Sequence, residues 1–320
     1  MKFLCLPGAY GSAKNFAIQL GPLAEEMSRR SLGTFSYTQG SHAVEPPPGW
    51  EGYFGAPPLF RFLDTTRGDA FETLRRLRHV PQSMNPEDTI REFQRAGPGS
   101  NEWHARAWQG ALDDVFRTID GDDEVDALLG YSEGAMVGAS VIVEEAKREA
   151  ATGRRRRIKF AVFISGAPPL RLDGHKIVSC LRDEAGVVID IPTFHIFGCD
   201  DAFLSSAVAL YNVCDPDGAK MYDHGLGHIV PRDAENVGLL GEILGRVVPR
   251  VEADAKRQRQ REMAEKRAAA RSTRAGAARR PGGRERSLSE LSVGSTGGAD
   301  GDFGVRHDLE PLKEMDFTSG

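Results

Sequence analysis

A serine set between two glycines is the first feature of the chain that could do chemistry. Residues 130–134 (GYSEG) have the form G-x-S-x-G, after an apolar run and before small, helix-compatible residues. In such a nucleophile elbow the serine occupies a strained turn, and the glycines let the strand and the helix approach closely. The N-terminus of the helix behind the turn favours developing negative charge. The pentapeptide therefore predicts Ser132 as a nucleophile for acyl transfer.

A serine hydroxyl needs a base within hydrogen-bond reach to attack at neutral pH. Where this motif occurs, the chain order is Ser, then Asp or Glu, then His. Asp200 and Asp201 follow an apolar stretch in HIFGCDDAF, and His224 and His228 lie in YDHGLGHIVPRD. Ser132, Asp201 and His228 have the required order. Asp200 and His224 remain alternatives, because adjacent positions after a strand point in different directions.

Acyl transfer also needs donors for the oxyanion of its tetrahedral intermediate. The first is expected to be the backbone N–H of Glu133, directly after the nucleophile. The second usually comes from the loop after an early strand. The segment LPGAYG follows the first apolar stretch, so the N–H of Ala9 is the candidate.

Strand-like and helix-like segments alternate along the first 250 residues. This alternation predicts an α/β fold with a parallel sheet and helices on both faces. Reacting groups then collect at the carboxyl ends of the strands, and each triad candidate follows a different strand. Residues 40–68, rich in Pro, Gly and aromatics, are predicted to be an irregular loop. The expected strands are 2–6, 34–38, 125–129, 159–164, 192–197 and 220–222, and the expected helices lie within 14–30, at 102–119, at 135–150, around 205–213 and from about 231.

The composition changes sharply near residue 250. Residues 251–286 are rich in Arg, Lys, Gln, Glu and Ala, and residues 287–320 in Ser, Gly and Asp. Neither part can bury enough apolar surface to offset the entropy of ordering. We therefore expect a domain over 1–250 and a charged, low-complexity tail over 251–320, partly helical and then disordered. A solvated tail is favoured over an RNA- or membrane-binding segment.

The bulk properties exclude several classes of protein. The 320 residues carry a formal net charge of −5, which gives no reason to expect nucleic-acid binding. No apolar run approaches the roughly 20 residues that span a bilayer, and the N-terminus does not resemble a secretory signal, so a cytoplasmic location is expected. No metal site or cofactor is predicted. The four cysteines are not spaced as metal ligands, and their pattern is typical of a protein in a reducing compartment. Cys199 is interpreted as a core residue, and so is His195, which lies within a predicted strand.

Five segments together resemble the fungal serine hydrolase (FSH1-type) family of α/β-hydrolases. They are KFLCLPG, GYSEGA, FISGAPP, PTFHIFGCDD and HGLGHIVP, and the resemblance covers residues 1–245. It implies a doubly wound, mostly parallel sheet with helices on both faces. The family pattern carries an Asp three residues after the strand-ending glycine, which corresponds to Asp201. Its His before a proline-bounded helix start corresponds to His228 rather than His224.

Two positions depart from the family pattern. Pro7 stands where the family commonly has His, and proline lacks an N–H and fixes its own φ, so the oxyanion loop is expected to differ in shape. Glu133 stands where the family often has Gln. Its acidic side chain near the serine suggests a shifted pH optimum or a preference against anionic substrates.

Residues 38–64 resemble the branch of this family associated with polyketide biosynthesis. The resemblance implies a thioesterase that releases a polyketide from the carrier domain of a polyketide synthase. The alternatives are a general carboxylesterase, an acyl-protein thioesterase, or a non-catalytic hydrolase-fold protein that binds through its tail. The residues expected to bind the acyl substrate are Tyr10, Trp50, Tyr53, Phe54 and Tyr131.

Overall fold

A single parallel sheet organises the N-terminal part of the protein. The computed structural model describes residues 1–46, 48–50, 52–63, 85–96 and 102–278, and contacts divide the chain into the units Met1–Glu265 and Lys266–Gly320. The sheet strands are β1 (Lys2–Leu6), β2 (Thr34–Tyr37), β5 (Val125–Tyr131), β6 (Phe160–Ile164), β9 (Thr193–Phe197) and β10 (Ala219–Asp223). Their order is β10-β9-β6-β5-β1-β2, and every neighbouring pair is parallel.

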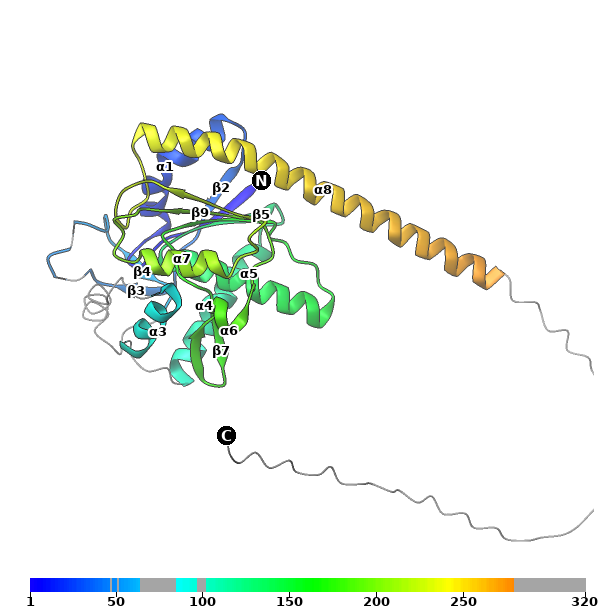
Figure 1. Ribbon diagram of the computed structural model, residues 1–320, viewed down its shortest axis with the longest axis horizontal. Helices are drawn as coiled ribbons and strands as arrows, with labels where there is room; N and C mark the ends of the chain where they lie inside the picture. Colours follow the sequence, from blue (N-terminus) through cyan, green and yellow to red (C-terminus); the bar gives the residue numbers. More distant parts are fainter. Residues whose placement is uncertain (47, 51, 64–84, 97–101, 279–320) are drawn as a thin grey trace, which may run out of the picture. The chain divides into compact units, whose positions relative to one another are not determined.

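Helices cover both faces of this sheet because successive strand side chains point to opposite sides. Phe3 and Cys5 of β1 pack with α1 (Ala13–Arg29) and the beginning of α8 (Ala234–Ala278). Leu4 and Leu6 point to the other layer, where α4 (Glu102–Asp120), α5 (Glu133–Thr152) and α7 (Leu204–Asn212) lie. Figure 1 shows the two layers, with α1 above the sheet and α4, α5 and α7 below it. The predicted α/β class is confirmed.

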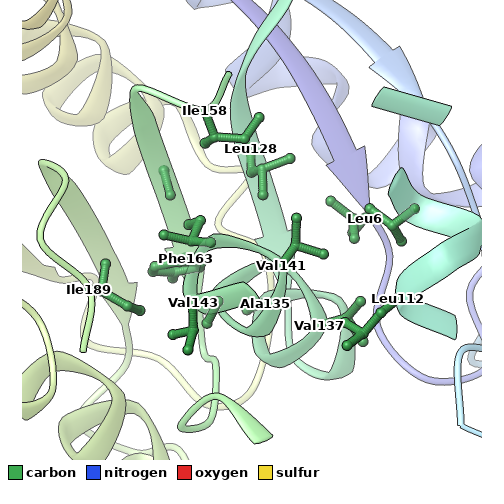
Figure 2. Packing of buried hydrophobic residues seen from close by; sticks show 14 of the residues in the cluster. Leu6, Leu112, Leu128, Ala135, Val137, Val141, Val143, Ile158, Phe163 and Ile189 are labelled. Atoms are coloured by element: carbon green, nitrogen blue, oxygen red, sulfur yellow. The ribbon is translucent and has the colours of Figure 1, made fainter. Parts of the chain in front are cut away.

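One cluster of the core lies between α5 and the central strands. Figure 2 shows side chains of β1, β5 and β6 meeting those of α5. Small residues on the inner face of α5 allow the helix to lie close to the sheet, and this holds its N-terminus against the ends of β1 and β5. The contacting residues include Leu6, Leu128, Phe163, Ala135, Val137 and Val141.

The strands and helices predicted within residues 1–250 are found within three residues of their expected limits. The irregular loop predicted over 40–68 is wrong in part, because β3 (His42–Val44) and β4 (Leu59–Arg61) form an antiparallel pair. Strands of three residues are too short for an alternation to be recognised. Residues 47, 51 and 64–68 of that segment lie outside the described part. The prediction also missed α3 (Pro86–Ala96), the β7 (Leu170–Asp173) and β8 (Lys176–Ser179) hairpin, and α6 (Arg182–Ala185).

The final helix continues past the predicted domain limit at residue 250. Helix α8 runs to Ala278, with Pro249 inside it, and from Glu252 to Glu265 its side chains are mostly exposed. The predicted disorder over 287–320 lies outside the described residues. Among the helices that are described, none has the length and apolar character needed to cross a membrane.

The burial of His195 in β9 predicts how the stability of the protein depends on pH. Its side chain is buried, its Nε2 lies 3.0 Å from Oγ1 of Thr193, and burial lowers its pKa to about 3. Below the ordinary pKa of about 6.5, the unfolded chain binds a proton here that the folded protein does not, so stability falls as the pH drops. His195→Gln should remove about 1.4 kcal/mol per pH unit from the slope of unfolding free energy between pH 6 and pH 4. Urea unfolding across that range measures it, and an unchanged slope would contradict a neutral, buried His195.

Candidate active site

Ser132 lies in a strained turn between β5 and α5. Its backbone has φ +52° and ψ −117°, a region that costs a non-glycine residue of the order of 1–3 kcal/mol. The amide donates to the carbonyl of Ile164 at 2.9 Å, which holds the turn against β6. Although Ser132 is the N-cap of α5, its side chain makes no capping hydrogen bond. The hydroxyl is therefore left to face another partner.

The two flanking glycines are required by close backbone approach. A Cβ at Gly130 would lie 2.5 Å from Cα of Ala135, and one at Gly134 would lie 2.3 Å from the carbonyl oxygen of Leu6. No side chain fits at such distances from backbone atoms. The glycines thus allow α5 to start directly against the ends of β1 and β5, as the motif predicted.

Gly134→Ala is therefore expected to destabilise the protein strongly. The methyl group would push α5 away from β1, and we expect the melting temperature to fall by about 6 °C or more, which corresponds to about 2 kcal/mol or more. Gly110→Ala in α4 is the matched control, because nothing lies within 4 Å of its added Cβ, and alanine stabilises a helix interior by up to about 1 kcal/mol. Thermal unfolding followed by circular dichroism measures both. Equal melting temperatures for the two variants would contradict the close approach.

The structure brings Ser132, Asp201 and His228 together at the carboxyl edge of the sheet. Nε2 of His228 lies 3.0 Å from Oγ of Ser132, and Nδ1 lies 2.8 Å from Oδ2 of Asp201. The hydroxyl of Tyr131 donates to the backbone carbonyl of His228 at 2.8 Å, which anchors the histidine loop to β5. The three side chains form one continuous hydrogen-bonded chain.

The rival residues do not join this chain. Asp200 is exposed, whereas the carboxylate of Asp201 is fully covered. His224 is buried with both ring nitrogens unpartnered among the described residues, and burial lowers its pKa. A neutral ring that does not reach the serine is poorly placed to act as its base.

The environment of Asp201 keeps its carboxylate ionised. Burial raises the pKa, but the hydrogen bond from His228, the electrostatic interaction with that ring and the amide of Phe203 outweigh it, so the pKa lies below its ordinary value. The Phe203 amide donates to Oδ1 at 2.8 Å. Because an ionised carboxylate only accepts hydrogen bonds, Nδ1 of His228 carries the proton. The lone pair of Nε2 then faces the serine hydroxyl.

The hydroxyl of Ser132 opens into an apolar cavity of about 660 Å³. Helix α3 contributes Ile90 and Phe93 to its wall. Among the aromatic side chains, Tyr10 and Phe54 have ring centroids 4.8 Å apart. The cavity is also lined by all of the residues predicted to bind substrate, namely Tyr10, Trp50, Tyr53, Phe54 and Tyr131.

Both predicted oxyanion donors belong to residues that line the same cavity. Glu133 is the first residue of α5, and the first N–H groups of a helix have no partner within it. Ala9 lies in a tight turn that the amide of Gly11 closes by donating to the carbonyl of Gly8 at 3.0 Å.

Several residues at the site were not predicted. The ring of Phe203 lies edge-on to His228, with centroids 5.2 Å apart, and Ser165 lines the cavity directly after β6. The sequence could have indicated both residues by their position, because Ser165 directly follows β6 and Phe203 lies in the segment between β9 and α7. Arg61 also lines the cavity, from the segment interpreted as a loop. The interpretation of Cys199 as a core residue is wrong: it is exposed, because the chain has already left β9 there.

The described residues include no cluster of three or more His, Cys, Asp or Glu side chains arranged to hold a metal ion. The groups that meet at the site are a hydroxyl and an imidazole backed by a carboxylate. The N-terminus of α5, whose first N–H groups have no partner within the helix, lies beside them. This arrangement can activate the hydroxyl for attack on a carbonyl carbon and stabilise the negative charge that develops.

Comparisons with known proteins identify the family. The family model described as "Serine hydrolase (FSH1)" matches residues 1–239. The chain is 27% identical over 237 residues to "Esterase FPY3" of Fusarium mangiferae, covering 72% of this chain and 89% of that protein. It is 26% identical to "Hydrolase phiM" of Talaromyces stipitatus, covering 73% and 82%. The crystal structure of a point variant of Arabidopsis thaliana SOBER1 covers 78% of this chain and 100% of its own, at 15% identity and a TM-score of 0.43. With its elbow serine and a family match spanning most of its length, the chain belongs to the serine hydrolase (FSH1) family and is a hydrolase.

Proposed function

We propose that the protein hydrolyses acyl esters or thioesters through an acyl-enzyme on Ser132. The observation that carries this proposal is the hydrogen-bonded chain from Asp201 through His228 to Ser132, which opens on an apolar cavity. Two relatives of the chain, in Fusarium mangiferae and Monascus ruber, are named esterases. Ester chemistry is therefore the reaction that the site and the relatives jointly favour.

In the first half-reaction, Oγ of Ser132 attacks the carbonyl carbon while Nε2 of His228 takes its proton. Asp201 holds the imidazole in the required tautomer and stabilises the imidazolium that forms. The tetrahedral intermediate collapses, the C–O or C–S bond breaks, and His228 returns the proton to the leaving group. In the second half-reaction His228 activates water, which releases the acid and restores the serine.

The amides of Glu133 and Ala9 are the proposed donors to the oxyanion. They come from the start of α5 and from the turn after β1, and both residues line the cavity beside Ser132. Losing one such donor typically lowers turnover by about 10²–10³. The positive end of the α5 dipole adds to their effect.

The acyl group is proposed to be an extended, apolar chain, held by Tyr10, Trp50, Tyr53 and Phe54. The cavity volume of about 660 Å³ falls in the range of sites for drug-sized ligands. Together with the resemblance of residues 38–64, this supports release of a polyketide from the carrier domain of a synthase as a thioester. A panel of acyl thioesters and p-nitrophenyl esters of increasing chain length tests it. We expect kcat/KM to rise with chain length, and a preference for short oxygen esters would count against a polyketide substrate.

A labelled fluorophosphonate separates an enzyme from a non-catalytic hydrolase-fold protein. The probe forms a covalent bond only with an activated serine. We expect rapid labelling of the wild type and none after Ser132→Ala. A folded wild-type protein that resists the probe would favour the non-catalytic alternative.

A further inference from the structure

The side chain of Glu133 is held by a buried set of hydrogen-bond donors. Its Oε1 accepts the backbone amides of Phe62 and Leu63, each at 2.8 Å, and its Oε2 accepts Nε of Arg61 at 2.9 Å. The side chain of Glu133 is only 5% exposed and that of Arg61 only 12%. A carboxylate buried to this extent needs such compensation, since an unpaired buried charge is strongly destabilising.

These contacts join the nucleophile elbow to the other wall of the cavity. Arg61 ends β4, and Glu133 lies 72 residues later at the first turn of α5. The backbone amide of Glu133 is the proposed oxyanion donor, and the same residue is tied through its carboxylate to the end of β4. These contacts limit the movement of the first turn of α5 relative to β4, and with it the movement of that amide.

The same contacts extend to the second oxyanion donor. The guanidinium of Arg61 lies 5.7 Å from the ring centroid of Tyr10, a cation–π distance. Tyr10 follows Ala9 directly and has φ +60°, a conformation that a bulky residue adopts only when its surroundings hold it. Arg61 thus contacts both the side chain of Glu133 and the ring of Tyr10, the residue that follows Ala9.

We propose that the Glu133 carboxylate and Arg61 form a positioning pair that holds both oxyanion-hole peptides, so that the acidic residue after the nucleophile acts through its side chain as well as its amide. This inference rests on the proposed function. It also gives Glu133 a role different from a shifted pH optimum or repulsion of anionic substrates, because its charge is paired with Arg61 and covered.

Glu133→Gln tests the pair directly. Glutamine keeps an oxygen for the amides of Phe62 and Leu63, but it loses the charge that faces Arg61 and turns an N–H₂ group toward that guanidinium. We expect kcat for p-nitrophenyl acetate to fall about ten- to a hundredfold, since small misplacements at a catalytic centre cost rate on this scale. KM should change less than threefold, because an oxyanion donor acts in the transition state.

Arg61→Met and the double variant Glu133→Gln/Arg61→Met complete a double-mutant cycle. Removing the guanidinium also removes the donor–donor contact that Glu133→Gln creates, so the double variant should recover at least threefold in kcat over Glu133→Gln alone. If each substitution instead disturbed the β3–β4 pair independently, the kcat losses of the two single variants would multiply in the double variant. Strictly multiplicative losses would overturn the pairing.

Glu145→Gln is the matched control. Glu145 is also a buried carboxylate on α5 that accepts two successive backbone amides, those of Arg157 and Ile158 at 3.1 and 3.2 Å. It lies outside the residues that line the cavity. Its replacement should lower the melting temperature with kcat within twofold of the wild type. An equal loss of kcat in both Glu→Gln variants would reduce the role of Glu133 to fold stability.

Fluorophosphonate labelling keeps the two proposals separable. If the wild type is labelled at Ser132 and Glu133→Gln turns over p-nitrophenyl acetate at the wild-type rate, the positioning pair is wrong and the proposed function stands. If a folded wild type is neither labelled nor active, the proposed function is wrong, and the positioning pair, which rests on it, is wrong with it. Reduced kcat with wild-type KM in Glu133→Gln, at a melting temperature no lower than that of Glu145→Gln, supports the pair.

Discussion

Replacing Ser132 with alanine is expected to abolish acyl-enzyme formation. The hydroxyl is the group that faces Nε2 of His228 at 3.0 Å, and alanine leaves the imidazole without a nucleophile to activate. Knocking out the serine of a comparable triad lowers turnover by about a million-fold. We expect hydrolysis of p-nitrophenyl butyrate to fall to the background rate and fluorophosphonate labelling to disappear.

The same substitution should leave the fold intact. Ser132 makes no capping hydrogen bond with its side chain, and alanine removes only a hydroxyl. A melting temperature within about 3 °C of the wild type would show that the loss is chemical. Residual turnover at about a tenth of the wild-type rate would mean that another group carries the reaction.

Asp201→Asn is expected to lower kcat by about 10⁴ with little change in structure. The asparagine amide can donate to Nδ1 of His228, which favours the tautomer whose Nε2 carries the proton and cannot accept from Ser132. The ionised Asp201 carboxylate normally prevents this, because hydrogen bonds from His228 and from the Phe203 amide hold its pKa below the ordinary value despite burial. Steady-state kinetics at about pH 8 measures the effect.

Asp200→Asn provides the matched control for this variant. Asp200 is the adjacent residue with the same chemistry, but it is exposed, and it is the carboxylate of its neighbour Asp201 that accepts the hydrogen bond from Nδ1 of His228. We expect its kcat to remain within twofold of the wild type. If Asp200→Asn proved as damaging as Asp201→Asn, the carboxylate behind the imidazole would have to be reassigned.

The amino-acid sequence by itself determined the secondary structure around the nucleophile. The apolar runs of β5, β6 and β9 are recognisable locally because a strand covered on both faces reads as continuous hydrophobic residues. The glycines around Ser132 are likewise a local requirement, set by backbone atoms only a few residues away or at the end of β1. For this reason the elbow and the parallel sheet could both be predicted.

Only the tertiary structure shows which of the neighbouring candidates meet. Asp201 and His228 meet across 27 residues, and His228 and Ser132 across 96, so residue type and chain order without the family pattern do not separate them from Asp200 and His224. The direction of each side chain depends on the loop that follows its strand. That loop takes its conformation from long-range packing.

The same reason explains what the sequence could not indicate about Glu133. Its partner Arg61 lies in a short strand that exists only as part of the β3–β4 pair. From sequence, Glu133 read as a free acidic group near the nucleophile; in the folded chain its charge is paired and covered. Residue types and their order determined the chemistry of this protein, and long-range contacts determined which atoms face one another, because side-chain direction is fixed by packing between segments far apart in the chain.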